Sequence, residues 1–296
     1  MLPETHPLHR KIKRARTFPL TTHLSPLDYL VKIFELAKTK IETISPITDN
    51  PYKQALFKTV IYGTRESSIE EERRDELDFK IFTDGSDHDR EVGAATVMYK
   101  KGLPAPTSHL KAYLGLSTKH NNYKAEVVGG ILATWLVTQS PIAHGKRVYI
   151  YTDNQSFIRT ATCPKASPGQ YLLQNFNREA NNSRAKLELR WISRHSNVQG
   201  NEKADRLAKE AVMGQANRRE ELPPILQRNL PTSVSSKNRE HMVQLKNEWK
   251  TLWQDSPRRE REQQDKLSRA HASLLLQVRS GHLSLNTYLY RIKKAD

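Results

Sequence analysis

Four acidic residues stand in local sequences that suit metal ligands. They are Asp84 in FTDGS, Glu126 in YKAEVV, Asp153 in YTDNQS and Asp205 in NEKAD. Carboxylates are preferred ligands of Mg²⁺, and a pair of such ions can assist the cleavage of phosphodiester bonds. The four acids therefore predict a carboxylate site for two Mg²⁺ ions, for which Mn²⁺ could substitute.

Each acid also has a simpler explanation when it is taken alone. Asp84 begins an Asp–Gly pair, a strong hairpin signal, and Asp153 could cap the helix that follows it. Glu126 and Asp205 could be ordinary acids on helix surfaces. A shared site is favoured because two of the acids fall at the ends of expected strands and two fall on expected helices, within one series of alternating strands and helices.

The elements that must position these acids follow from the periodicity of apolar residues. Alternation predicts a strand over 77–83 that ends in a turn at Asp84–Gly85–Ser86, where an acid lies at the end of a sheet. Four more strands are expected at 92–100, 109–116, 147–152 and 187–192, and helices at 121–137, 167–181 and 198–213. This order predicts an α/β fold with a mixed five-stranded sheet flanked by helices.

The motifs resemble those of the type 1 ribonuclease H family. The resemblance covers about 77–214, and its most specific part is the run WISRHSNVQGNEKADRLA at 191–208. It implies a ribonuclease H-like fold and endonucleolytic hydrolysis of the RNA strand of an RNA–DNA hybrid, with 5′-phosphate and 3′-hydroxyl products. Another nuclease or an integrase of the same fold would use three acids at different spacing, and the run at 191–208 argues against it.

The resemblance also implies a role for each acid. Asp84 would bridge the two ions, and Asp205 would help to hold the ion that activates the attacking water. Glu126 and Asp153 would help to hold the ion at the leaving oxygen.

Further site residues come from the same resemblance. His195 would be a catalytic loop histidine that assists product release or proton transfer. Asn122, Asn201 and Gln155 would contact the nucleic acid.

The flanks are similar to the C-terminal part of fungal non-LTR retrotransposon polyproteins, in which ribonuclease H follows a reverse transcriptase. The segments LPETHPLH at 2–9 and LLQVRSGHLSLN at 275–286 carry this resemblance. Three regions are expected: a basic, partly helical connector at 1–75, the ribonuclease H domain at 76–214, and a basic, mostly helical tail at 215–296. The 296 residues hold neither the polymerase nor the zinc-binding cysteines that this resemblance would lead one to expect, so the alternative expectation is a non-catalytic nucleic-acid-binding remnant of a retrotransposon.

The flanks also carry local predictions. A helix is expected at 25–40, linkers at 64–76 and 215–235, and two charged amphipathic helices within 236–279. Trp249 and Trp253 are expected to be packing anchors on the first of these two helices.

Composition narrows the partners and the compartment. The net charge of +16 over 296 residues suits a polyanion such as nucleic acid. Cys163 is the single cysteine, which excludes an internal disulfide and fits a reducing, intracellular compartment. The chain has no apolar run near the ~20 residues that cross a membrane. The basic cluster RKIKRAR at 10–16 could be a nuclear localisation signal, a phosphate-binding arm or a solvated linker.

Overall fold

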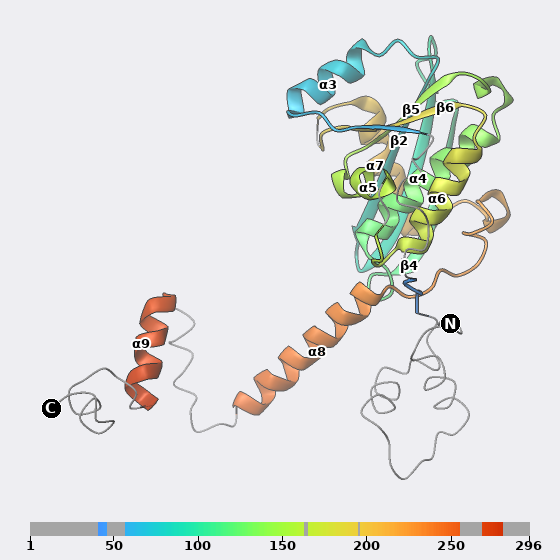
Figure 1. Ribbon diagram of the computed structural model, residues 1–296. Helices are drawn as coiled ribbons and strands as arrows, with labels where there is room; N and C mark the ends of the chain where they lie inside the picture. Colours follow the sequence, from blue (N-terminus) through green and yellow to red (C-terminus); the bar gives the residue numbers. More distant parts are fainter. Residues whose placement is uncertain (1–40, 46–56, 163–164, 195, 255–267, 281–296) are drawn as a thin grey trace. The chain divides into compact units, whose positions relative to one another are not determined.

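The computed structural model describes residues 41–45, 57–162, 165–194, 196–254 and 268–280 (Figure 1). The helix expected at 25–40 and the basic cluster at 10–16 lie outside these residues. The chain divides into two compact units, 1–240 and 241–296. The first unit contains a six-stranded sheet with helices on both faces.

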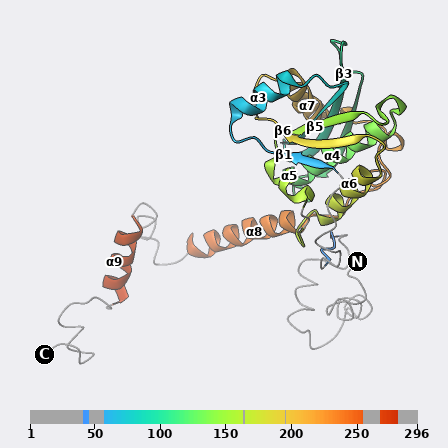
Figure 2. The same cartoon turned by 45° about the horizontal axis from the view of Figure 1, so that its top comes forward.

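The strands of the sheet lie in the order β1-β6-β5-β2-β3-β4. Their bounds are β1 Lys58–Val60, β2 Phe79–His88, β3 Glu91–Lys100, β4 Ser108–Leu116, β5 Arg147–Thr152 and β6 Lys186–Trp191. β2, β3 and β4 are antiparallel neighbours, whereas β5, β6 and β1 run parallel to β2. The mixed sheet is confirmed, and β1 adds a sixth strand beside β6 (Figure 2).

One strand end was predicted wrongly. β2 continues through Asp84, and the hairpin turn lies at Asp89 and Arg90, whose φ angles are 50° and 65°. The glycine that follows Asp84 serves close packing instead of a turn. A Cβ at Gly85 would lie only 2.8 Å from the Cβ of Ala125, which is on a helix packed against β2.

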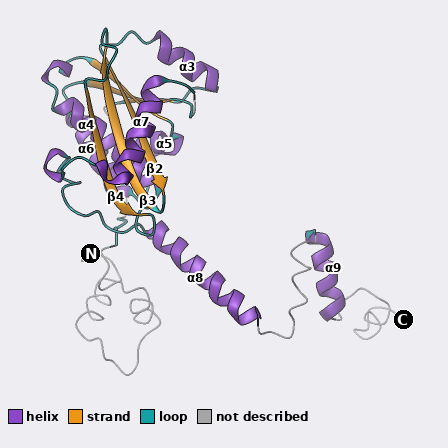
Figure 3. Cartoon of the chain, turned by 180° about the vertical axis from the view of Figure 1, so that it is seen from behind, coloured by secondary structure: helices purple, strands orange, loops and turns teal. Residues whose placement is uncertain are grey.

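Helices cover both faces of the sheet, which Figures 1 and 3 view from opposite sides. One face carries α4 (Asn122–Thr138), α5 (Gln155–Thr162) and α6 (Gln170–Asn182), which pack on residues such as Ile81 and Ile150. The other face carries α3 (Arg65–Arg74) and α7 (Gln199–Glu210), which pack on residues such as Phe82 and Tyr151. The linker predicted at 64–76 is therefore mostly the helix α3, which begins with a capping box at Thr64.

Residues 41–45 are held in the first unit by a fully buried ion pair. Glu42 and Lys124 have side chains with 0% and 1% exposure, and their charged atoms lie 3.0 Å apart. The Glu42 carboxylate also accepts hydrogen bonds from the backbone N–H of Gly169 and of Val234, at 2.9 and 2.8 Å. The Glu42 N–H donates to the carbonyl of Thr232 at 2.9 Å. Segments from both sides of the predicted domain thus meet at the first turn of α4.

Residues 216–237 pack against the sheet and helices of the first unit, to which they belong, whereas the sequence predicts a loose linker at 215–235. Asn217 exchanges two hydrogen bonds with the backbone of Lys111 in β4, at 2.8 and 2.9 Å. Leu222 and Leu226 are buried in the core on the α4 face. The compact unit is therefore wider than the range 76–214 expected for the domain.

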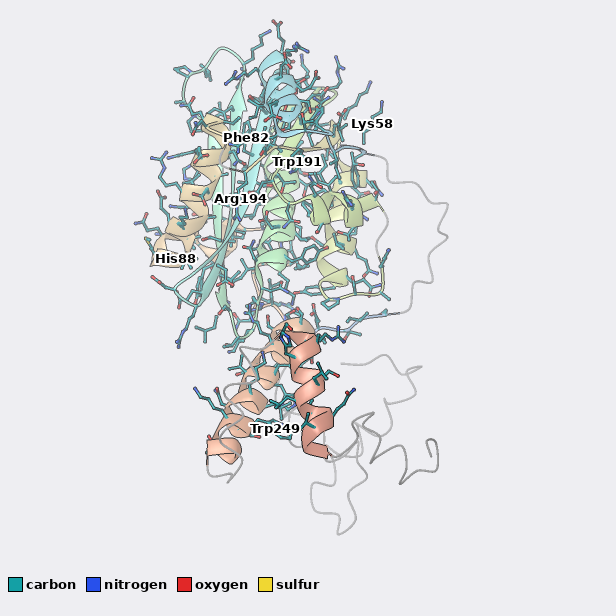
Figure 4. All side chains as sticks on the ribbon, turned by 90° about the vertical axis from the view of Figure 1, so that its left-hand side faces the viewer. Lys58, Phe82, His88, Trp191, Arg194 and Trp249 are labelled. Carbon is teal, nitrogen blue, oxygen red and sulfur yellow. The ribbon has the colours of Figure 1, made fainter. Side chains whose placement is uncertain are left out.

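The remaining helices are α8 (Val234–Gln254) and α9 (Arg269–Ser280). They are the two helices predicted within 236–279. Trp249 of α8 is 56% exposed, and its role as a packing anchor stays a prediction (Figure 4). The side chain of Trp253 lies outside the description. No described helix is long and apolar enough to cross a membrane.

Candidate functional site

Two of the acids follow the last paired residues of neighbouring parallel strands. The pairing of β2 with β5 ends at Thr83 and Thr152, and Asp84 and Asp153 come next. β5 ends there, whereas β2 continues to His88, so the two strands are no longer paired beside Asp84. Such a separation at the carboxyl end of a parallel pair is where α/β sheets place their sites.

Asp153 is not used as a helix cap. The side-chain oxygen of Asn154 accepts a hydrogen bond from the N–H of Phe157 at 3.0 Å, so Asn154 caps α5. The backbone carbonyl of Asp153 accepts a hydrogen bond from the Trp191 indole at 3.1 Å. These contacts fix the backbone at Asp153, and its carboxylate is not needed to cap α5.

Glycines let two helices approach β2 and bring the other two acids near. A Cβ at Gly85 would lie 2.8 Å from the backbone nitrogen of Glu126, so only glycine allows α4 this close. On the opposite face, a Cβ at Gly200 would lie 2.2 Å from the ring of Phe82. That contact brings α7, which carries Asp205, down onto β2.

Three of the acids converge. Asp84, Glu126 and Asp153 each offer one oxygen atom, and these atoms lie within 4.8 Å of one another. Asp84 is 3% exposed and Glu126 is 1% exposed. Within the described residues, Asp84 Oδ1 and Glu126 Oε2 are buried without a hydrogen-bond partner. Unsatisfied buried oxygens are costly, and a hard divalent cation would satisfy them, so these residues fit such an ion.

The electrostatics of the cluster point the same way. Burial first, and then the charges of Asp153 and Asp205, raise the pKa of Asp84 to about 8. Burial, followed by the charges of Asp84 and Asp153, raises the pKa of Glu126 well above its ordinary value. Without a cation the carboxyl groups cannot all ionise at low cost, and a bound cation reverses this effect.

Asp205 lies at the margin of this cluster. It is outside the three-acid group, yet its charge and a hydrogen bond to Asp84 both raise the pKa of Asp84. Its Oδ2 also pairs with Lys209 Nζ at 2.6 Å. The structure thus brings all four acids to one end of the sheet, with three of them at ligand distance.

Arg194 is a site residue that the sequence prediction missed. Its Nε lies 3.2 Å from Asp153 Oδ2, and its side chain is 61% exposed (Figure 4). Its charge lowers the pKa of Asp84 and Glu126 against the larger raising effects. The one available signal was its position in the run at 191–208. His195, the next residue, lies outside the described residues.

The three predicted nucleic-acid contacts differ in their surroundings. Asn122 donates to Glu126 Oε1 at 3.4 Å, so it borders the acids, and its own Oδ1 is buried without a partner in the described structure. Asn201 is buried near the start of α7. Gln155 is partly exposed and accepts a hydrogen bond from Arg159 at 3.2 Å. No described hydrogen bond joins Asn201 or Gln155 to the four acids.

Several solved structures are similar to this chain. The N-terminal RNase H domain of a Mycobacterium tuberculosis protein is 18% identical, with a TM-score of 0.38, and the match covers 47% of this chain and 96% of that one. LC11-RNase H1 from compost, in complex with RNA/DNA hybrid, is 19% identical, with a TM-score of 0.39 and coverage of 46% and 97%. The protease-reverse transcriptase of prototype foamy virus is 16% identical, with a TM-score of 0.37 and coverage of 46% and 21%.

A comparison with family models assigns the central segment. No curated protein matches the chain significantly. Residues 76–213 match the model described as RNase H, and this range contains all four acids and five of the six strands. Residues 76–213 therefore form an RNase H domain within a longer chain.

Proposed function

We propose that the chain hydrolyses the RNA strand of RNA–DNA hybrids and leaves 5′-phosphate and 3′-hydroxyl ends. The observation that carries this proposal is the cluster of Asp84, Glu126 and Asp153, with oxygens within 4.8 Å, inside the matched segment. A buried group of acids with unsatisfied oxygens costs stability in the metal-free protein. Such a cost favours a role in binding cations for catalysis.

The acids would act as a preorganised holder for two Mg²⁺ ions, or for Mn²⁺ in their place. Bound ions of this kind activate a water molecule and stabilise the charge on the leaving oxygen. The charges of Asp153, which follows β5, and of Asp205 on α7 both act on Asp84, so Asp84 is suited to serve both ions. Arg194 holds Asp153 in position from the solvent side, and His195 would assist proton transfer or product release.

The remaining contacts would select the hybrid. Asn122, Asn201 and Gln155 are proposed to contact the nucleic acid, and the net charge of +16 favours a polyanion. RNA would be distinguished by its 2′-hydroxyl groups in a wide minor groove. Cleavage should therefore show little sequence preference. The sequence of the flanks further supports a proposed origin in a retrotransposon and an intracellular, nuclear location.

The decisive test is cleavage of a labelled RNA–DNA hybrid in Mg²⁺, with Asp153→Asn beside the native chain. Asp78→Asn is the matched control, because Asp78 is an exposed acid that pairs with Lys146 at 2.9 Å. We expect cleavage of the RNA strand alone, lost in Asp153→Asn and kept in Asp78→Asn. A folded native chain that cleaves nothing in Mg²⁺ or Mn²⁺ would instead be a non-catalytic nucleic-acid-binding remnant.

A further inference from the structure

A cavity of about 780 Å³ lies between the end of β4 and the segment 216–237. This is the size of a site for small molecules. Its apolar lining comes from Leu114, Leu116, Leu222, Leu226 and Leu230. Its basic lining comes from Lys119, Arg219, Arg228 and Lys237, and no aspartate or glutamate is among its lining residues. Most of these residues lie beyond the matched RNase H segment, which ends at residue 213.

The positive charge of this cavity is only partly neutralised. The exposed side chains of Lys119 and Arg228 form no hydrogen bond or ion pair with the described residues. Arg219 donates to the neutral Asn229 at 2.7 Å, and only Lys237 has an acidic partner, Glu240, at 2.7 Å. A concave, apolar surface with unpaired cations favours a ligand that is partly flat and apolar and partly anionic.

His120 supplies an unsatisfied polar group in the wall. It is 3% exposed, and its Nδ1 is buried without a hydrogen-bond partner in the described part of the chain. Burial, followed by the charges of Lys124 and Lys119, lowers its pKa to about 4. The imidazole is therefore neutral at physiological pH and can exchange hydrogen bonds with a ligand without adding charge.

The cavity lies near the acids. Lys111 of β4 stands opposite Ala95, which stands opposite Asp84, so Lys111 and Asp84 are two strands apart, or about 10 Å. The lining of the cavity begins at the next residue of β4, Ala112. His120 comes two residues before α4, the helix that carries Glu126. The near end of the cavity, at Ala112, is therefore about two strands from Asp84 in the sheet, a span that one nucleic-acid strand can cover.

We propose that this cavity binds an unpaired nucleotide of the nucleic-acid substrate, with its base on the leucine walls and its phosphate at Lys119 and Arg228. Proteins hold single strands by combining a positively charged groove along the backbone with aromatic side chains on which the bases stack, and Tyr113 is among the lining residues of this cavity. This inference rests on the proposed function, since it extends the substrate from a hybrid to a hybrid with a single-stranded extension. A free nucleotide has the same chemistry, and the experiment separates the two sources.

Binding is measured by fluorescence anisotropy in the Asp153→Asn background, in Mg²⁺, so that the substrate persists. Blunt hybrids are compared with hybrids that carry a single-stranded extension of about ten nucleotides, within the usual size of single-strand sites. Arg228→Glu and Lys119→Glu are the test variants. Arg218→Glu is the matched control, because Arg218 is exposed in the same segment and does not line the cavity.

We expect the extension to tighten binding by about tenfold. Arg228→Glu and Lys119→Glu should each remove most of this gain, whereas Arg218→Glu should keep it. The milder Arg228→Ala should lower the slope of log affinity against log salt by about one, the loss of one phosphate contact. Thermal unfolding of each variant checks that the fold is unchanged.

Equal affinity for blunt and extended hybrids would overturn the proposal, as would equal effects of the substitutions at Arg228 and Arg218. A nucleoside monophosphate that displaces the extension at micromolar concentration would assign the cavity to free nucleotides instead. Displacement by oligoglutamate as readily as by a single strand would show a general anion cleft. Cleavage of the blunt hybrid by the native chain tests the proposed function separately, so the two can fail independently.

Discussion

Replacing Asp84 with asparagine should stabilise the metal-free protein while it abolishes cleavage. Burial and the neighbouring acids Asp153 and Asp205 raise the pKa of Asp84 from 3.8 to about 8. The native state then binds a proton that the unfolded chain releases. The free energy of unfolding therefore falls as pH rises from about 4 to about 8, and Asp84→Asn removes this loss because asparagine does not titrate.

The magnitude follows from the size of the shift. Each pKa unit corresponds to about 1.4 kcal/mol, so between pH 3.8 and pH 7 the native state loses up to about 4 kcal/mol through Asp84. The charge of Asp84 also raises the pKa of Glu126, so removing that charge lets Glu126 ionise more easily. Part of the free energy gained at position 84 therefore appears as a lower pKa of Glu126. We therefore expect Asp84→Asn to gain about 2–4 kcal/mol at pH 7 in EDTA, and several degrees in Tm.

Urea unfolding in EDTA at pH 5, 7 and 8 measures this gain, which should grow with pH. Millimolar Mg²⁺ should stabilise the native chain more than the variant, because the variant lacks one ligand. Asp78→Asn is the control of opposite sign, since a hydrogen bond and the charge of Lys146 lower the pKa of Asp78. A gain that is absent, or that does not depend on pH, would refute the reasoning.

Three further predictions concern the surroundings of the acids. Arg194→Gln removes the charge that lowers the pKa of the buried carboxyl groups of Asp84 and Glu126. The acid limb of the pH–rate profile should therefore move to higher pH by up to about one unit. An acid limb that does not move would mean that Arg194 does not influence catalysis. Gly85→Ala should push α4 away from β2 and lower the free energy of unfolding by about 1–3 kcal/mol. Because this shift displaces Glu126, most of the cleavage rate should also be lost. Gly63→Ala, where nothing lies within 4 Å, should cost little in the same unfolding and cleavage assays. Glu42→Gln should lower the free energy of unfolding in urea by about 3–5 kcal/mol, because it leaves Lys124 buried without its counterion; a neutral result would mean that the pair is not what holds residues 41–45.

The strands and helices with strong periodicity could be predicted from sequence. β5 and β6 are apolar or alternating runs, and they appear at 147–152 and 186–191, close to the expected bounds. The acids could be proposed because each stands in a distinctive local motif. Their convergence depends on where β5 ends and on the close approach of α4 at Gly85, which only the folded chain reveals.

Other features leave little trace in the sequence. β1 has three residues, too few for a periodic pattern, and α3 has one sizeable apolar residue, Ile69. α3 is instead supported by polar contacts beside its end, where Asp75 pairs with Arg190 at 2.8 Å and accepts a hydrogen bond from the Tyr151 hydroxyl. The hairpin turn at residues 89–90 has no glycine, so the nearby Asp–Gly pair was the stronger but misleading signal.

The junction at Glu42 has a consequence for how the chain can be rearranged. The Glu42 N–H donates to the Thr232 carbonyl at 2.9 Å. The segment that precedes the domain and the segment that follows it are therefore adjacent. A short peptide could join them, and new termini could be opened at the exposed turn at Asp89 and Arg90. The domain should therefore tolerate circular permutation, and it could be inserted into a loop of another protein without separating the ends of that loop.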